Sequence, residues 1–475
     1  MISKARLAGL GTPIWVGVAG VVVTLVAARS LALVGAVVVA AVTAVMIVAT
    51  AVAEALRRLL ARMRRTPLRS RGLELADFEA PARVPRLLMR PRGGPLVDVV
   101  LAVPSVAVLG WLLWRDHRSG LRLRAVDAIS TAVRRFEPDV ILYFAGNPEE
   151  VYQLRMWFAP VDRLGVRALV VLRSDAVMDE LTDSPFPVVS STYNGLIASL
   201  PLPKRVVTLF VTHSGNNLSM LRRPETVCVF VGHGESDKPD SSNPYARVYD
   251  EVWVAGPLGR RRYAEAAVGV RDDVIREVGR PQFVPPDTPP PKPPVIVYAP
   301  TWEGWGDDPH HSSLPHLGVR LVDALLANPG VTVRYRPHPL TGRRHPDVRR
   351  AHEAIVKRVG RVPDDEPIER TMAGAAAMVL DVSSVIAEYL AYDRPYAVAD
   401  TRGMGRRTHT RRFPSTGGGF LLGPDLSGLD AFVVAATGGR DSTTAKRRAL
   451  LHDALGDPAT SQDRFAAAVG RLRRG

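Results

Sequence analysis

The sequence has only one cysteine, Cys228, among its 475 residues, so no disulfide can form within the chain. Secreted proteins often depend on several disulfides, and this composition favours a globular part that lies in the cytosol. The sequence also lacks the Cys/His clusters typical of zinc sites, the P-loop of many nucleotide hydrolases and the GxSxG turn of serine hydrolases. It therefore predicts neither a metal site nor these two kinds of catalysis.

Basic residues outnumber acidic ones, 62 to 47, and give a formal net charge of +15. Such a balance suits an anionic partner, which can be nucleic acid, an acidic membrane or a phosphate-rich substrate. No zinc-finger or RNP-type pattern is present, so we expect no nucleic-acid partner. The excess charge is better assigned to an anionic membrane surface and a phosphate-containing substrate.

Two apolar runs near the amino terminus, residues 13–28 and 31–53, are separated only by Arg29 and Ser30. About 20 apolar residues cross a bilayer as a helix, so we predict a transmembrane helical hairpin. Arginines are frequent between residues 57 and 71, and a basic cluster after a span marks the cytoplasmic side. We therefore expect a protein of the cell membrane whose catalytic domains face the cytoplasm. A single spanning helix with a buried flank is the alternative.

A third apolar run, residues 95–114, is ambiguous. Asp98 and Pro104 are unfavourable in a helix that faces lipid, whereas Trp111 and Trp114 are typical of the membrane interface. We expect an interfacial or re-entrant segment within a membrane-anchoring region, residues 1–120; a third span is the alternative.

Beyond this region, short apolar runs alternate with helical patterns, which predicts parallel β-sheets covered by helices. Prolines interrupt the alternation between residues 281 and 294 and indicate a stiff linker. The predicted fold is α/β, a GT-B-like pair of Rossmann-like domains; one long irregular α/β domain is the alternative. We expect an amino-terminal acceptor domain at residues 121–280 and a linker at 281–294. A carboxy-terminal nucleotide-binding domain at 295–440 and final helices at 441–475 follow.

A histidine between two glycines, Gly232-His233-Gly234, follows the apolar run 227–231. The glycines permit a tight turn that exposes the imidazole at the end of a strand. Imidazole accepts a proton near neutral pH, so His233 is a candidate catalytic base. Lys238, four residues after Gly234, can offset phosphate charge, although a solvated loop histidine and lysine would give the same pattern.

Three more groups follow predicted strands of the second α/β unit, and parallel sheets bind ligands at that edge. Tyr298-Ala299-Pro300-Thr301-Trp302 ends the first strand, and its small residues let a nucleotide approach the backbone. Arg336 and His338 follow the next strand and combine a cationic fork with an imidazole donor suited to pyrophosphate. A core-edge tryptophan and a solvated turn are the structural alternatives.

The third group contains Asp381, Ser383 and Ser384, between a strand and a helix. Serines there are ordinary helix caps, but the same geometry can bind an anion through hydroxyls and free N–H groups. Glu388 lies one turn further along the helix, on the same side as Ser384. It is either a ligand for sugar or ribose hydroxyls or a surface charge.

In this order, the motifs resemble the CDP-glycerol glycerophosphotransferase family, the teichoic-acid polyol-phosphate transferases. The resemblance covers residues 227–400 and rests on the His-Gly element with its lysine, the Tyr-Ala-Pro-Thr strand end, the His-Pro pair and the Asp-x-Ser-Ser-x-x-x-acid-Tyr element. In this sequence these are His233, Gly234 and Lys238, then Tyr298 to Thr301, His338 and Pro339, and Asp381, Ser383, Ser384, Glu388 and Tyr389. Glu388 stands where aspartate is usual, and Glu235 and Asp237 add negative charge after His-Gly.

The resemblance implies a GT-B-type transferase that needs no metal or other cofactor. Its substrates would be CDP-glycerol or a related CDP-polyol and an envelope polymer or lipid-linked acceptor, with CMP released. His233 would be the base or would orient the acceptor, and His338, Arg336, Ser383 and Ser384 would stabilise pyrophosphate charge. The alternative function is a GT-B glycosyltransferase or epimerase-like enzyme that uses a UDP-sugar for envelope polysaccharide.

Overall fold

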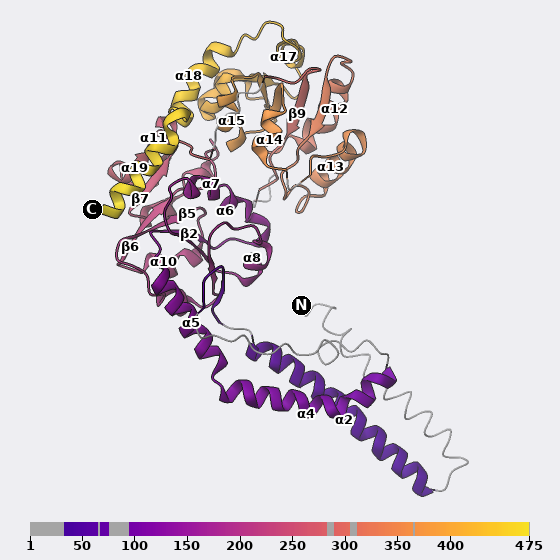
Figure 1. Ribbon diagram of the computed structural model, residues 1–475. Coiled ribbons are helices and arrows are strands. Elements are labelled where there is room, and N and C mark those ends of the chain that lie inside the picture. The colour runs from indigo at the N-terminus through magenta and orange to yellow at the C-terminus, as the bar shows by residue number, and fades with distance from the viewer. Residues whose placement is uncertain are drawn as a thin grey trace. The chain divides into compact units, whose positions relative to one another are not determined.

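The computed structural model describes residues 33–64, 67–75, 95–282, 289–304, 311–363 and 366–474. The chain divides into two compact units, residues 1–135 and residues 136–475 (Figure 1). The first predicted membrane helix, residues 13–28, and much of the predicted linker, at 283–288, lie outside the described residues.

The first unit is helical and contains α2 (Leu33–Arg64), the short strand β1 (Arg69–Arg71), α4 (Pro95–Arg118) and most of α5 (Leu121–Phe136). α2 packs against α4 through buried leucines, among them Leu60, Leu109 and Leu113. Within the described residues, Ala40–Leu60 is the helix segment long and apolar enough to cross a membrane. One such segment is consistent with membrane association, and the hairpin remains a prediction.

The ambiguous third run, residues 95–114, forms part of one continuous helix, α4. Trp111 and Trp114 are 54% and 55% exposed. The guanidinium groups of Arg115 and Arg118 lie over their rings, each 5.1 Å from the centroid. These amphipathic pairs are typical of a membrane interface, but their position in a membrane stays a prediction.

The second unit contains two parallel sheets, which define an amino-terminal and a carboxy-terminal lobe. In the amino-terminal lobe, the strands of this unit run in the order β4-β3-β2-β5-β6-β7-β8. Buried Val, Leu and Ile side chains fill most of these strands, as expected for a sheet covered on both faces. The elements are β2 (Val140–Phe144), α6 (Tyr152–Arg155), α7 (Phe158–Asp162), β3 (Ala168–Leu172), α8 (Asp175–Glu180), β4 (Val188–Ser190), α9 (Asn194–Ala198), β5 (Val206–Phe210), α10 (Leu218–Leu221), β6 (Thr226–Phe230), β7 (Glu251–Val254), α11 (Pro257–Ala266) and β8 (Ile275–Glu277).

The sheet of the carboxy-terminal lobe has the order β10-β9-β11-β12-β13, and every pair is parallel. Its elements are β9 (Val295–Ala299), α12 (Val319–Leu326), β10 (Thr332–Tyr335), α13 (Pro346–Val359), α14 (Ile368–Ala373), β11 (Ala377–Leu380), α15 (Ser384–Tyr389), β12 (Tyr396–Ala399), α16 (Gly405–Arg412), β13 (Phe420–Leu422) and α17 (Leu429–Ala436). Two parallel α/β lobes form a GT-B-like fold, so this part of the predicted fold class is confirmed.

The last two helices return towards the amino-terminal lobe (Figure 1). They are α18 (Thr444–Leu455), which contacts α11, and α19 (Ser461–Arg474). Phe465 of α19 is fully buried, with its ring centroid 5.6 Å from that of Trp157 and 5.7 Å from that of Trp253. Helix α19 therefore completes the hydrophobic core of the amino-terminal lobe.

Candidate functional site

The turn that carries His233 follows β6 and is held in place by a hydrogen bond from a tryptophan. Gly232 has a φ of +61°, a left-handed conformation that favours glycine. The indole Nε1 of Trp157 donates a buried hydrogen bond of 2.7 Å to the carbonyl oxygen of Gly232. Trp157 thus fixes the backbone that presents the imidazole.

The hydrogen bonding of His233 leaves one nitrogen able to accept a proton. Its Nδ1 lies 3.1 Å from the carbonyl oxygen of Val211. A carbonyl oxygen can only accept, so in the neutral ring Nδ1 carries the proton and Nε2 keeps its lone pair. Burial lowers the pKa of His233, and the charge of Arg280 lowers it further. The ring is therefore neutral at pH 7, as a general base must be.

His338 has the opposite arrangement. The backbone N–H of Leu340 donates to its Nδ1 at 3.1 Å, so the ring proton resides on Nε2. Trp302 stacks against the ring, with centroids 5.8 Å apart and an angle of 19°. Burial, followed by the charge of Lys238, lowers the pKa of His338 to about 3. This imidazole is therefore a neutral N–H donor, suited to a phosphate oxygen.

The two imidazoles come from different lobes and lie near each other. A charge on His233 contributes to the lowered pKa of His338. The hydroxyl of Tyr152, in α6 of the amino-terminal lobe, lies 3.4 Å from Nε2 of His338. The structure thus brings His233 and His338 to the same region between the sheets, beyond the carboxyl ends of β6 and β10.

Lys238, Thr301 and Asp381 form a second contact between the lobes. Nζ of Lys238 donates to the hydroxyl of Thr301 at 2.8 Å. Oδ2 of Asp381 accepts the backbone N–H groups of Thr301 and Ser313 at 2.9 and 3.0 Å. Burial raises the pKa of Asp381 to about 6. The carboxylate therefore orders the loop after β9, which carries Thr301 beside the lysine.

The serines after β11 face the glycine of the histidine turn. A Cβ placed on Gly234 would lie 2.7 Å from Cβ and 2.8 Å from Oγ of Ser384, so only glycine permits this approach. Ser383 and Ser384 are partly exposed, and neither hydroxyl makes a hydrogen bond within the described residues. Both remain available to an anionic ligand near His233.

Glu388 lies in a buried ion pair. Its Oε1 accepts from Nη2 of Arg280 at 2.9 Å, and the two side chains are 8% and 5% exposed. The same Arg280 nitrogen donates to the carbonyl oxygen of His233 at 3.0 Å. Glu388 therefore reaches the histidine turn through Arg280, and its predicted contact with a hydroxyl of the substrate stays a prediction.

Arg336 and Pro300 border this group of residues. Nη1 of Arg336 donates to the carbonyl oxygen of Pro363 at 2.8 Å, and its charge contributes to the lowered pKa of His338. Pro300 is buried at the end of β9. Both residues lie at the carboxyl edge of the second sheet, as predicted. The guanidinium group of Arg336 is bound partly to its own, carboxy-terminal lobe through Pro363.

The acidic residues that follow His-Gly have structural partners. Arg262 donates to Glu235 and to Asp237, each at 2.9 Å. Asp237 also accepts the backbone N–H of Ser415 at 2.8 Å. Their negative charge is therefore balanced by α11, and the loop that holds His233 is tied to the carboxy-terminal lobe.

Sequence patterns did not reveal several residues that shape this site. Glu303 is 4% exposed and accepts the N–H groups of Gly342 and Arg344, which fixes the loop after His338. His213 stacks on Phe230 with centroids 3.8 Å apart, and both of its ring nitrogens are buried without a hydrogen-bond partner among the described residues. His213 comes three residues after β5, just as His233 comes three residues after β6. This position at the end of a strand could have identified His213 as a residue near the site.

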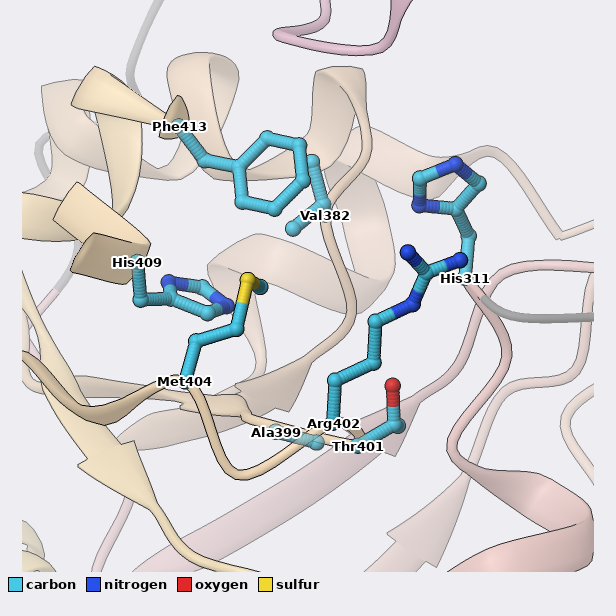
Figure 2. Close-up of a pocket in the computed structure, with 8 residues that line it drawn as sticks. All are labelled: His311, Val382, Ala399, Thr401, Arg402, Met404, His409 and Phe413. Atoms are coloured by element: carbon cyan, nitrogen blue, oxygen red, sulfur yellow. The ribbon is translucent and has the colours of Figure 1, made fainter. Parts of the chain in front are cut away.

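Two cavities lie outside this group. A space of about 20 Å³ beside α16 is lined by residues that include His311, Val382 and Arg402 (Figure 2). It can hold about one water molecule and is far too small for a nucleotide. A hollow of about 510 Å³ adjoins Pro294 and Pro395, at the amino-terminal edge of the second sheet. Neither cavity coincides with the two histidines.

No group of three or more His, Cys, Asp or Glu side chains within the described ranges is arranged to hold a metal ion. The site can still act on a phosphate-containing ligand through its own groups. These are an imidazole base, an imidazole N–H donor, an ammonium group and two hydroxyls.

Comparisons with solved structures give distant similarities. The wall teichoic acid polymerase TagF is 12% identical, with a TM-score of 0.46 over 75% of this chain and 96% of that one. A glycosyltransferase from Rickettsia africae is 11% identical, with a TM-score of 0.43 over 70% of this chain and 98% of that one. HepE from Anabaena, in complex with UDP-glucose, is 16% identical, with a TM-score of 0.40 over 70% and 99%. These similarities concern the fold and are too distant to assign a substrate.

No curated protein sequence matches the chain. Residues 284–402 match the family model described as CDP-Glycerol:Poly(glycerophosphate) glycerophosphotransferase. This segment contains Thr301, His338, Asp381 and Ser384, and the match confirms the family resemblance drawn from those motifs. The matched segment therefore indicates a transferase of the CDP-glycerol glycerophosphotransferase type.

Proposed function

We propose that the protein transfers a glycerol-phosphate unit, or a related polyol-phosphate unit, from a CDP-activated donor to a cell-envelope polymer or lipid-linked acceptor. CMP is the other product, and the polymer is of the teichoic-acid type. The match of residues 284–402 to the family model supports the donor class. The observation that carries the catalytic role is the opposite hydrogen bonding of two imidazoles from the two lobes. Nδ1 of His233 faces the carbonyl oxygen of Val211, whereas Nδ1 of His338 accepts from the backbone N–H of Leu340.

In the proposed reaction, Nε2 of His233 takes the proton of an acceptor hydroxyl as its oxygen attacks the phosphorus on the polyol side of the diphosphate. The bond from that phosphorus to the bridging oxygen breaks, and CMP leaves with the bonding electrons. Nε2–H of His338 and the ammonium group of Lys238 are donors for the negative charge on the diphosphate. The hydroxyls of Ser383 and Ser384 contribute further donors.

The acceptor and the membrane setting belong to the same proposal. The apolar segment Ala40–Leu60 supports attachment to the cell membrane. The basic residues after it favour an orientation in which the catalytic lobes face the cytoplasm. Arg57 and Arg58 both pair with Glu54, so α2 itself contributes less free positive charge than its sequence suggests. A hairpin formed with residues 13–28 would complete the anchor.

The direct test is release of CMP from CDP-glycerol by the purified full-length protein with a lipid-linked acceptor. His233→Ala and His338→Ala are each expected to abolish release, while melting curves show that the fold persists. His452→Ala replaces an exposed histidine of α18 and serves as the matched control. Full activity in both site variants would reject the catalytic assignment.

Donor identity is tested separately by calorimetric titration against CDP- and UDP-linked compounds. We expect binding of CDP-glycerol or another CDP-polyol. Strong binding of a UDP-sugar without binding of any CDP-polyol would instead support the alternative glycosyltransferase or epimerase-like enzyme.

A further inference from the structure

A strongly basic surface lies beside the candidate site, on the carboxy-terminal lobe. The basic segment, residues 401–412, comprises the loop after β12 and helix α16. It contains Arg402, Arg406, Arg407, Arg411 and Arg412, all of them exposed. No acidic residue occurs between Asp400 and Asp425 in the sequence.

The four arginines of helix α16 are not neutralised by acidic side chains of the described residues. None of Arg406, Arg407, Arg411 and Arg412 forms an ion pair with a carboxylate of the described residues. Arg406 donates to the carbonyl oxygen of Gly419 at 2.9 Å, and Arg412 lies over the ring of Phe413. Asp400 is 2% exposed and accepts the backbone N–H of Gly405, so this nearby carboxylate is engaged at the start of α16.

The basic segment adjoins the residues of the transfer site. Arg402 and Phe413 line the small cavity that also contains Val382, the residue after Asp381 (Figure 2). Ser415, just beyond α16, donates its backbone N–H to Asp237 in the His233 loop at 2.8 Å. A long ligand that enters the site can therefore continue over α16.

We propose that the basic segment binds the anionic acceptor polymer, a chain of phosphodiesters, and holds its extended part while the terminal hydroxyl reacts. This inference rests on the proposed function. Guanidinium groups bind phosphate through paired hydrogen bonds, and a row of them matches a polymer with one negative charge per repeat. No large apolar side chain is exposed within residues 401–412, all of which the structure describes. A helix that inserts into a membrane surface needs an apolar face, so the composition favours a soluble polyanion.

The test compares acceptors of two lengths in the full-length protein. In the triple variant R407Q/R411Q/R412Q, we expect the KM for long poly(glycerol phosphate) to rise about tenfold or more. The KM for CDP-glycerol and the rate with a glycerol-phosphate dimer should not change. The control variant R222Q/R247Q/R440Q removes three exposed arginines elsewhere and changes the net charge equally. An unchanged KM for the long acceptor in the first variant would overturn the proposal.

Two further measurements separate the possible failures. If the wild-type protein releases no CMP from CDP-glycerol, the proposed function fails. Binding of labelled long poly(glycerol phosphate) then tests, without any reaction, whether the basic segment binds the polymer. Weaker, less salt-dependent binding by the first triple variant supports the proposal, and equal binding overturns it. Sedimentation with phosphatidylglycerol vesicles tests the membrane: loss of vesicle binding with unchanged polymer binding would reassign this surface to lipid and overturn the proposal.

Discussion

The guanidinium group of Arg280 joins the two lobes by donating from one nitrogen to both the carboxylate of Glu388 and the backbone carbonyl of His233. Both side chains are buried, so the charge of each depends on the other for its stability. The ion pair therefore supports the fold and positions the His233 turn at the same time.

Replacing Arg280 with alanine is expected to lower the free energy of unfolding by about 3–5 kcal/mol, because the Glu388 charge is left buried without a partner. The rate of CMP release should fall as well, since the His233 carbonyl loses its donor. Thermal melting and steady-state kinetics provide the two measurements. Arg271→Ala breaks the exposed pair with Asp273 and should cost less than about 1 kcal/mol. Equal melting temperatures for the two variants would contradict a supporting role for Arg280.

Gly234→Ala tests the close approach between the lobes. The new methyl group would meet Ser384, which should separate the histidine turn from α15 and lower kcat/KM by about tenfold or more. Adding Ser384→Gly removes the opposing side chain and should bring kcat/KM back to the level of Ser384→Gly alone, which lacks only the proposed hydroxyl donor. Gly215→Ala is the control, because nothing lies within 4 Å of its Cβ position. Failure of Ser384→Gly to rescue would show that the contact is not the cause.

Trp157→Phe removes the indole N–H that holds Gly232 while keeping an aromatic ring in the core. An unsatisfied buried carbonyl costs about 1–3 kcal/mol, and the freed turn should lower kcat more than it changes the KM for the donor. Trp253→Phe is a matched control, since Trp253 also packs on Phe465 but donates to Glu251 at 2.8 Å. If Trp253→Phe lowered kcat equally, a general effect of the core would explain the result.

The dependence of kcat/KM on pH should reflect the lowered pKa of His233. As the pH falls through that pKa, Nε2 becomes protonated and the base is lost, so the acidic limb should have its midpoint below 6.5. His338, with a pKa of about 3, should stay neutral across this range. His213 has a pKa lowered to about 4 by burial, and His213→Phe should keep the position of the limb. A midpoint above 6.5 in kcat/KM would contradict the neutral, buried base.

Much of the fold was predictable because strands buried on both faces produce continuous apolar runs. The apolar runs of the sequence at 140–144, 168–172, 251–254 and 377–380 coincide with strands of the structure. The short strands β4, β8 and β13 were missed, since three residues carry too little pattern. Residues 148–161 have the pattern of one helix but form several shorter turns and helices in the structure.

The candidate site was predictable where it follows strands and was not where it depends on contacts distant in sequence. His233, His338 and Asp381 each lie within three residues of the end of a strand, so their common edge could be inferred. Arg280 follows β8, a strand that was not predicted, and its partner is 108 residues away. The role of Trp157 likewise depends on a contact 75 residues distant, which no local spacing reveals.

The position of Phe465, Val469 and Leu472 has a consequence for biosynthesis. These apolar side chains fill the core of the amino-terminal lobe, whose first strand lies more than three hundred residues earlier. That lobe therefore stays incomplete on the ribosome until residues 465–472 have emerged, and we expect its apolar surface to be exposed until then. An amino-terminal lobe produced without α19, or a chain truncated before α19, would lack these side chains and is expected to aggregate.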